Sequence, residues 1–148
     1  MALRMSTALC NKLHDTNPTK TIFNLGFLKL YTGTPPASAD AAATGTLAVT
    51  VSNNSTGTGL TWGPTASGGT LTKTSGEVWS GTVAAGGPLT ITYFRVVAVG
   101  DTGANNTTEP RVQGTVGIGG TDMVVGNPVL SSGATFTINF ATLSFVPS

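Results

Sequence analysis

The most apolar run in the chain covers residues 91–99 and reads ITYFRVVAV. From residue 96 to residue 99 the apolar side chains follow one another without interruption, so they fall on both faces of an extended strand. Strands that are apolar on both faces are typical of the middle of a sheet, where both sides are covered. The run therefore predicts a central, two-sided buried strand.

Further strand-like runs lie on both sides of it. They fall at residues 23–31, 46–52, 59–62, 70–74, 78–83, 111–118, 123–125 and 135–145. Asn-Asn, Gly-Pro and Gly-Gly pairs separate them, and these residue types favour turns. In the last run the apolar side chains change face after Phe140, which predicts a β-bulge near residues 141–142.

The spacing of these runs predicts the fold class. About eight or nine short strands, roughly 8–12 residues apart and with no helical pattern between them, indicate an antiparallel β-sandwich or barrel. A jelly roll of eight strands fits this count and the length of 148 residues best. Up-and-down barrels and immunoglobulin-like sandwiches remain alternatives, although the Cys…Trp…Cys spacing of the latter is missing. We predict an all-β fold with a sandwich domain over residues 21–148.

The N-terminal segment, residues 1–20, has a different pattern. Met5, Leu9 and Leu13 follow a helical period, and Leu3 lies near the same stripe. We therefore expect a short helix or arm here, ended by the proline-containing stretch that follows. A helix of about 13 residues is marginal in water on its own. Its apolar stripe needs a partner, which is either the chain's own sandwich or another subunit.

The chain carries very little charge. Charged residues make up 9% of it, against about 25% in an average protein, and the net charge is +1. Nucleic-acid binding depends on clustered cations that neutralise phosphates, and the seven Lys and Arg residues are scattered. With little self-repulsion, such a chain associates readily. We expect no nucleic-acid partner and a role as a component of an assembly.

The sequence contains no recognisable catalytic pattern. His14 is the only histidine, and the six acidic residues fall in or beside predicted turns without forming a paired motif. Cys10 is the only cysteine, so neither an internal disulfide nor a Cys/His zinc cluster is expected. We predict that the protein is not an enzyme and uses no cofactor or metal.

The segment from residue 1 to residue 13 lacks the continuous apolar core of about 7–15 residues that a signal peptide requires. No run in the sequence approaches the roughly 20 apolar residues of a membrane-spanning helix. We therefore expect synthesis and folding in the cytoplasm, with no membrane partner.

Arg95 interrupts the predicted central strand, where an unpaired charge would be costly. Two interpretations are open: an intramolecular ion pair, with Glu77 as the candidate partner, or a contact with another subunit. Trp62, Trp79 and Tyr93 also have two interpretations, because aromatic residues anchor both protein cores and protein interfaces.

Three groups of residues together resemble a known family. The first is MALRMST at residues 1–7 followed by LYTGTPPASADAA at residues 30–42. The second is GEVW at residues 76–79, with YFR at residues 93–95. The third is DTGA at residues 101–104, PRVQGTVG at residues 110–117 and GTDM at residues 120–123. In this order they resemble small structural proteins of tailed bacteriophages, some of which are similar to jelly-roll decoration (cement) proteins of phage heads.

The resemblance implies a capsid-binding role and no active-site residue. It implies a protein made in the host cytoplasm that binds the major capsid protein on the outer surface of the phage head. We also expect association with further copies of itself, as a dimer or trimer. The candidate capsid or inter-subunit contacts are Leu3, Met5, Leu9, Leu13 and Arg95. The alternative function is a receptor- or carbohydrate-binding module of a tail fibre or spike, which would call for exposed aromatic residues in loops.

Overall fold

In the computed structural model, which describes residues 3–15 and 17–144, the apolar run forms the strand β6 (Leu89–Val97). This strand pairs antiparallel with β2 (Phe27–Thr32) on one side and with β7 (Arg111–Gly117) on the other. The side chains of residues 93–97 are all buried, although they point alternately to opposite faces. The predicted central strand is confirmed.

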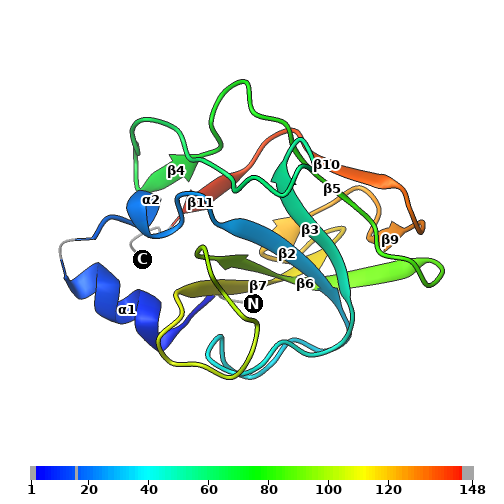
Figure 1. Ribbon diagram of the computed structural model, residues 1–148, viewed down its shortest axis with the longest axis horizontal. Coiled ribbons are helices and arrows are strands. Elements are labelled where there is room, and N and C mark those ends of the chain that lie inside the picture. The colour runs from blue at the N-terminus through cyan, green and yellow to red at the C-terminus, as the bar shows by residue number, and fades with distance from the viewer. Residues whose placement is uncertain (1–2, 16, 145–148) are drawn as a thin grey trace.

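Most of the other strands extend this sheet, and two of them form a small second sheet. They are β1 (Arg4–Met5), β3 (Leu47–Asn53), β4 (Thr70–Thr72), β5 (Trp79–Thr82), β8 (Met123–Val124), β9 (Val129–Leu130), β10 (Thr135–Ile138) and β11 (Thr142–Ser144). The main sheet has the order β1-β7-β6-β2-β3-β5-β10, with β8 added to β7 and β9 added to β6, while β4 and β11 form a small second sheet. In Figure 1, β5, β10 and the β4–β11 pair lie above β2, β6 and β7. The predicted all-β, jelly-roll-like sandwich is confirmed.

The hydrophobic core fills the space between these layers. Trp62 and Trp79 pack edge to face in it, with ring centroids 5.0 Å apart. On β6, Ile91 joins Phe94 and Val96 in the core because the pairing with β2 shifts register beside Ile91. Such an irregularity lets side chains an odd number of residues apart share one face.

The opposite face of β6 and β7 is covered by two loops instead of a second sheet. They comprise residues 33–46 and residues 98–110. The phenol of Tyr93 lies in hydrogen-bond contact with the backbone of Thr44 in the first loop, and its ring stacks on Tyr31 at 4.9 Å. Gln113 donates to the carbonyl oxygen of Pro36 at 2.8 Å. This cover explains why the central strands are buried on both faces.

The structure corrects the prediction for the end of the chain. No bulge joins residues 135–144 into one strand: β10 ends at Ile138, and β11 begins at Thr142 in the other sheet. The change of face after Phe140 therefore marks a passage between sheets. Phe145, the last residue of the predicted strand, lies outside the described residues. Residues 59–62 make isolated bridges and do not form the predicted strand.

The N-terminal segment contains the helix α1 (Thr7–His14), and α2 (Thr19–Ile22) follows it. The helix α1 begins at Ser6, whose hydroxyl oxygen accepts a hydrogen bond from the backbone N–H of Leu9 at 3.2 Å. Before it, β1 pairs with the start of β7. The predicted short helix is present, and strand pairing joins its N-terminal end to the main sheet.

Candidate functional site

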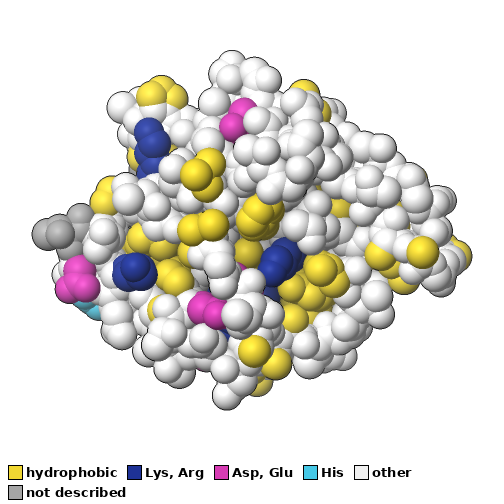
Figure 2. Space-filling view, viewed as in Figure 1, with side chains coloured by type: hydrophobic (Ala, Val, Ile, Leu, Met, Phe, Trp, Pro, Cys, Tyr) yellow, Lys and Arg dark blue, Asp and Glu magenta, His cyan; other side chains and the backbone are white. Residues whose placement is uncertain are grey.

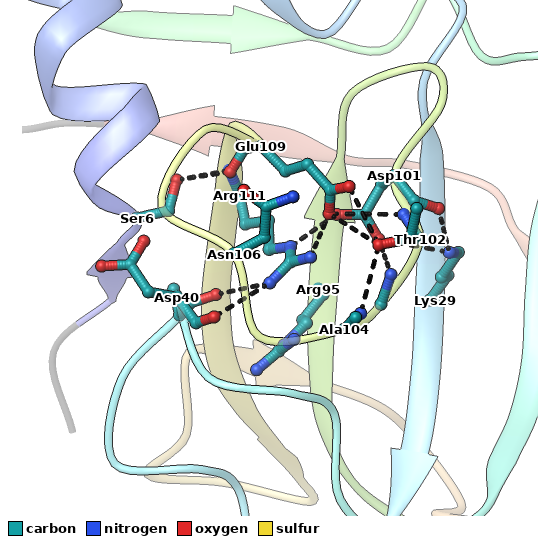
Figure 3. Close-up of polar contacts among 12 residues, drawn as sticks. Ser6, Lys29, Asp40, Arg95, Asp101, Thr102, Ala104, Asn106, Glu109 and Arg111 are labelled. Carbon is teal, nitrogen blue, oxygen red and sulfur yellow. Dashed lines mark hydrogen bonds and ion pairs between the residues drawn. The ribbon is translucent and has the colours of Figure 1, made fainter.

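A buried polar network ties the two covering loops to the sheet. Figure 3 shows the guanidinium group of Arg111 among the carboxylates of Asp101 and Glu109 and the backbone of Asp40. Its Nε lies 2.5 Å from Asp101, a second nitrogen pairs with Glu109, and a third donates to the carbonyl oxygens of Ala39 and Asp40 at 3.2 and 3.3 Å. The Arg111 side chain is fully buried. All these bonds are internal, so the network holds the loops in place.

Arg95 lies beside this network and is also fully buried. It donates to the side-chain oxygen of Gln113 at 3.0 Å and to the carbonyl oxygen of Ala41 at 2.9 Å. Burial, together with the positive charge of Arg111, lowers the pKa of Arg95 from its ordinary value. With no exposed surface in this structure, the side chain contributes to packing beneath the loop of residues 33–46.

The pairing of Arg95 with Glu77 is wrong. The carboxylate of Glu77 accepts hydrogen bonds from the indole nitrogen of Trp79 at 2.7 Å and from the backbone and hydroxyl of Thr61 at 3.1 and 2.8 Å. Burial works to raise the pKa of Glu77, but these hydrogen bonds and the charge of Lys73 outweigh it and lower the pKa. Glu77 therefore supports the turn before β5, which two strands, β2 and β3, separate from the strand of Arg95.

The four apolar candidates of the N-terminal segment occupy different environments. Leu9 is fully buried in the core, and Leu3 packs against the core beside Gly114. Met5 and Leu13 are exposed by 42% and 36%, respectively. The predicted stripe is thus divided between the chain's own sandwich and the surface, and Met5 and Leu13 are the two of these four side chains that are exposed.

Leu13 lines a shallow groove of about 770 Å³. The groove lies between the segment that links the two helices and the small sheet of β4 and β11, with Pro18, Leu71 and Leu143 among its lining residues. Its charged lining residues are Asp15 and Lys20, one of each sign. Here an apolar surface is accessible next to the helix predicted to make contacts.

A second apolar cleft, of about 610 Å³, opens between the two layers of the sandwich. Leu3, Phe94 and Val96 line one side of it, and consecutive residues of β10 and β11 line another. Phe140, between these two strands, is 77% exposed at the cleft. The strand pattern of the sequence does not predict this cleft, and the one local signal is that residues 123–144 contain no charged residue.

The surface shown in Figure 2 is dominated by uncharged side chains, with isolated basic and acidic groups. Apart from Phe140, the described Phe, Tyr and Trp side chains are buried or half-buried. Trp62, Trp79 and Tyr93 belong to the buried interior. An aromatic platform of the kind that stacks on sugar rings is therefore not found within residues 3–15 and 17–144.

The described part of the chain shows no group of three or more His, Cys, Asp or Glu side chains placed to hold a metal ion. His14, at the end of α1, is exposed. Neither described helix has the length and apolar character needed to cross a membrane. Comparisons with models of protein families, with curated proteins and with solved structures found no match for this chain.

Proposed function

We propose that this chain is a structural protein of a tailed-bacteriophage virion, a decoration protein that binds the outer surface of the head. The observation that carries the proposal is the near-absence of charge from a surface that also exposes apolar side chains. Such a surface is suited to being covered by neighbouring protein subunits. The sequence resemblance supplies the neighbour, the major capsid protein.

The physical effect of such binding is thermodynamic linkage. A protein that binds only the assembled shell stabilises it by RT ln(1 + [L]/Kd), in which [L] is the free concentration of the decorating chain. Repetition over the symmetry-related sites of the lattice multiplies this effect. No chemical step is required.

The N-terminal surface formed by Met5 and Leu13 is the proposed capsid contact. Both side chains are exposed, at opposite ends of a short segment in which Ala8 and Leu9 are buried and Cys10 is half-buried. Removing residues 1–20 is a poor test, because it would also remove Leu9 from the core and Ser6 from the buried polar contacts. Point substitutions of the two exposed residues leave these contacts in place.

The test mixes purified protein with undecorated heads of the phage that encodes it and measures the bound fraction by sedimentation. We expect the double variant Met5→Ser/Leu13→Ser to occupy fewer sites than the unmodified chain. Val99→Ser is the matched control, since Val99 is 67% exposed but lies on the loop after β6. Equal binding of all three proteins would exclude the N-terminal surface. Failure of the unmodified chain to bind heads would exclude decoration itself.

The alternative role as a carbohydrate-binding module of a tail fibre or spike has less support. Sugar-binding surfaces commonly use exposed aromatic rings, whereas here Trp62, Trp79, Tyr31 and Tyr93 are all buried. Phe140 is exposed, but no second exposed aromatic ring accompanies it within the described residues.

A further inference from the structure

The strand β10 is an unprotected edge of the main sheet. It pairs with β5 on one side, and no strand of the described residues pairs with its other side. Natural sheets protect such edges with charged residues, proline or a bulge, because unpaired N–H and C=O groups attract strands of other chains. Residues 135–140 read TFTINF and contain neither a charge nor a proline. The edge is therefore chemically open to strand pairing.

The apolar cleft runs along this same edge. Its lining includes consecutive residues 136–139, whose side chains point alternately to opposite faces of β10. A cavity lined by successive residues of one strand lies along the edge of that strand. The volume of about 610 Å³ falls within the roughly 300–1,000 Å³ of pockets that enclose small molecules, so it has room for a phenyl ring.

The same surface also supplies a group that would fill such a cleft. Phe140 lies two residues after the end of β10, is 77% exposed and is among the residues that line the cleft. Asp122 is the charged residue among the cleft's lining residues, and its carboxylate accepts hydrogen bonds from the backbone and hydroxyl of Thr115, both at 2.8 Å. The other lining residues are mostly apolar, with Asn127, Thr137, Asn139, Thr142 and Ser144 as uncharged polar ones, so an uncharged group such as a phenyl ring suits the cleft.

We propose that two copies of this chain form a two-fold dimer through β10, with Phe140 of each copy entering the apolar cleft of the other. A two-fold axis pairs an edge strand with its own copy in the antiparallel sense, and it requires a surface that is complementary to itself. The projecting ring and the receiving cleft lie on one surface, which meets that requirement. In the antiparallel pair, Phe140, two residues after the end of one β10, lies near the start of the other, where Phe136 lines the cleft.

The charge of the chain favours a second copy as the occupant. Pairing two copies through β10 brings no like charges together within residues 123–144, because this segment carries no charge. Pairing the two edges would extend the sheet across the axis and satisfy backbone groups that otherwise depend on water. The proposal does not depend on the proposed capsid function, because it concerns the free protein.

The test measures the molar mass of the full chain by sedimentation velocity over a concentration series. We expect a species of twice the 14.9 kDa chain mass, which dissociates on dilution. Thr137→Lys places a like charge near the axis on both copies and should shift the protein to the monomer. Phe140→Ser should do the same by removing the apolar ring, whereas Val99→Ser should leave the dimer intact.

Hydrogen exchange locates the interface independently. The backbone amides of residues 135–140 should exchange more slowly at dimer-forming concentration than after dilution, and circular dichroism should show that each variant remains folded. A monomer at all concentrations would overturn the proposal. So would a dimer that Thr137→Lys and Phe140→Ser leave unchanged, because another surface or another occupant would then be responsible.

Discussion

Arg111 carries the largest share of the polar interactions between the loops and the sheet. Its buried guanidinium group meets two carboxylates and two carbonyl oxygens, and Asp101 is itself only 2% exposed. Removing one member of a buried ion pair commonly costs about 3–5 kcal/mol, because the partner is left charged in a poorly solvated place. The stability of the network therefore depends more on Arg111 than on the more exposed pair of Lys29 and Asp101.

We predict that Arg111→Met lowers the free energy of unfolding by about 3–5 kcal/mol in urea titrations. Lys29→Met is the control: Lys29 reaches Asp101 at 3.4 Å from a more exposed position, and its loss should cost less than that of Arg111, because Asp101 still pairs with Arg111. If Arg111→Met does not fold, Arg111→Lys should fold with lower stability than the unmodified chain. Equal costs for the Arg111 and Lys29 variants would contradict this role.

Glu77 gives the protein a pH-dependent component of stability. Because its folded pKa lies below the ordinary value of 4.5, the folded state favours the charged carboxylate. The contribution is present above the unfolded pKa and is lost as pH falls through the folded pKa. We predict that Glu77→Gln is less stable than the unmodified chain at pH 7 and that the difference shrinks below about pH 4.5. Urea titrations over pH 3–7 measure it, and a constant difference would refute the assignment.

The position of Arg95 in an apolar strand predicts its burial correctly, but the predicted partner, Glu77, is wrong. The order of the sheet explains why: β2 and β3 lie between β6, which carries Arg95, and β5, which follows Glu77. A period of two shows which face a residue occupies, but it does not show which strands are neighbours. The actual partners, Gln113 on β7 and the loop carbonyl of Ala41, depend on that long-range order.

At the scale of elements, Ser6 joins three parts of the fold. Its hydroxyl oxygen accepts from the backbone N–H of Leu9 in α1 and from that of Arg111 at the start of β7, and it donates to the carbonyl oxygen of Glu109 at 3.0 Å. Ser6 is fully buried, so water does not replace these bonds easily. The helix is thereby fixed to the sheet at its first turn.

We predict that Ser6→Ala lowers the free energy of unfolding by about 1–3 kcal/mol, because buried N–H groups lose their acceptor. Ser132→Ala, at an exposed position between β9 and β10, should change it by less than about 0.5 kcal/mol. Chemical denaturation of both variants provides the comparison. A Ser6→Ala variant as stable as the Ser132→Ala variant would show that the three bonds do not anchor the helix.

The elements that the sequence predicted well are those long enough to show a period. The strands β2, β3, β6 and β7 are such cases. By contrast, β1 and β9 have two residues each and show no periodic signal. The passage from β10 to β11 resembled a bulge because both produce the same change of face, and only the separate pairing of the two strands distinguishes them.

At the scale of the whole molecule, the fold class followed from the spacing of strands and turns. The cleft did not, because it forms where residues near the two ends of the described chain meet: Leu3 lies on one side of it and β10 and β11 on another. Such a meeting depends on the order of the strands, which local patterns do not encode. The division of the N-terminal stripe between core and surface depends on the same long-range packing.

The most direct test of the proposed role as a head decoration protein is the copy number of this chain in purified virions of the phage that encodes it. Quantitative mass spectrometry would give its ratio to the major capsid protein. The account predicts a ratio of the same order as that of a lattice subunit, since a decoration protein occupies repeated sites over the head. A few copies per particle, as expected of a tail or fibre component, or complete absence from the virion would contradict it.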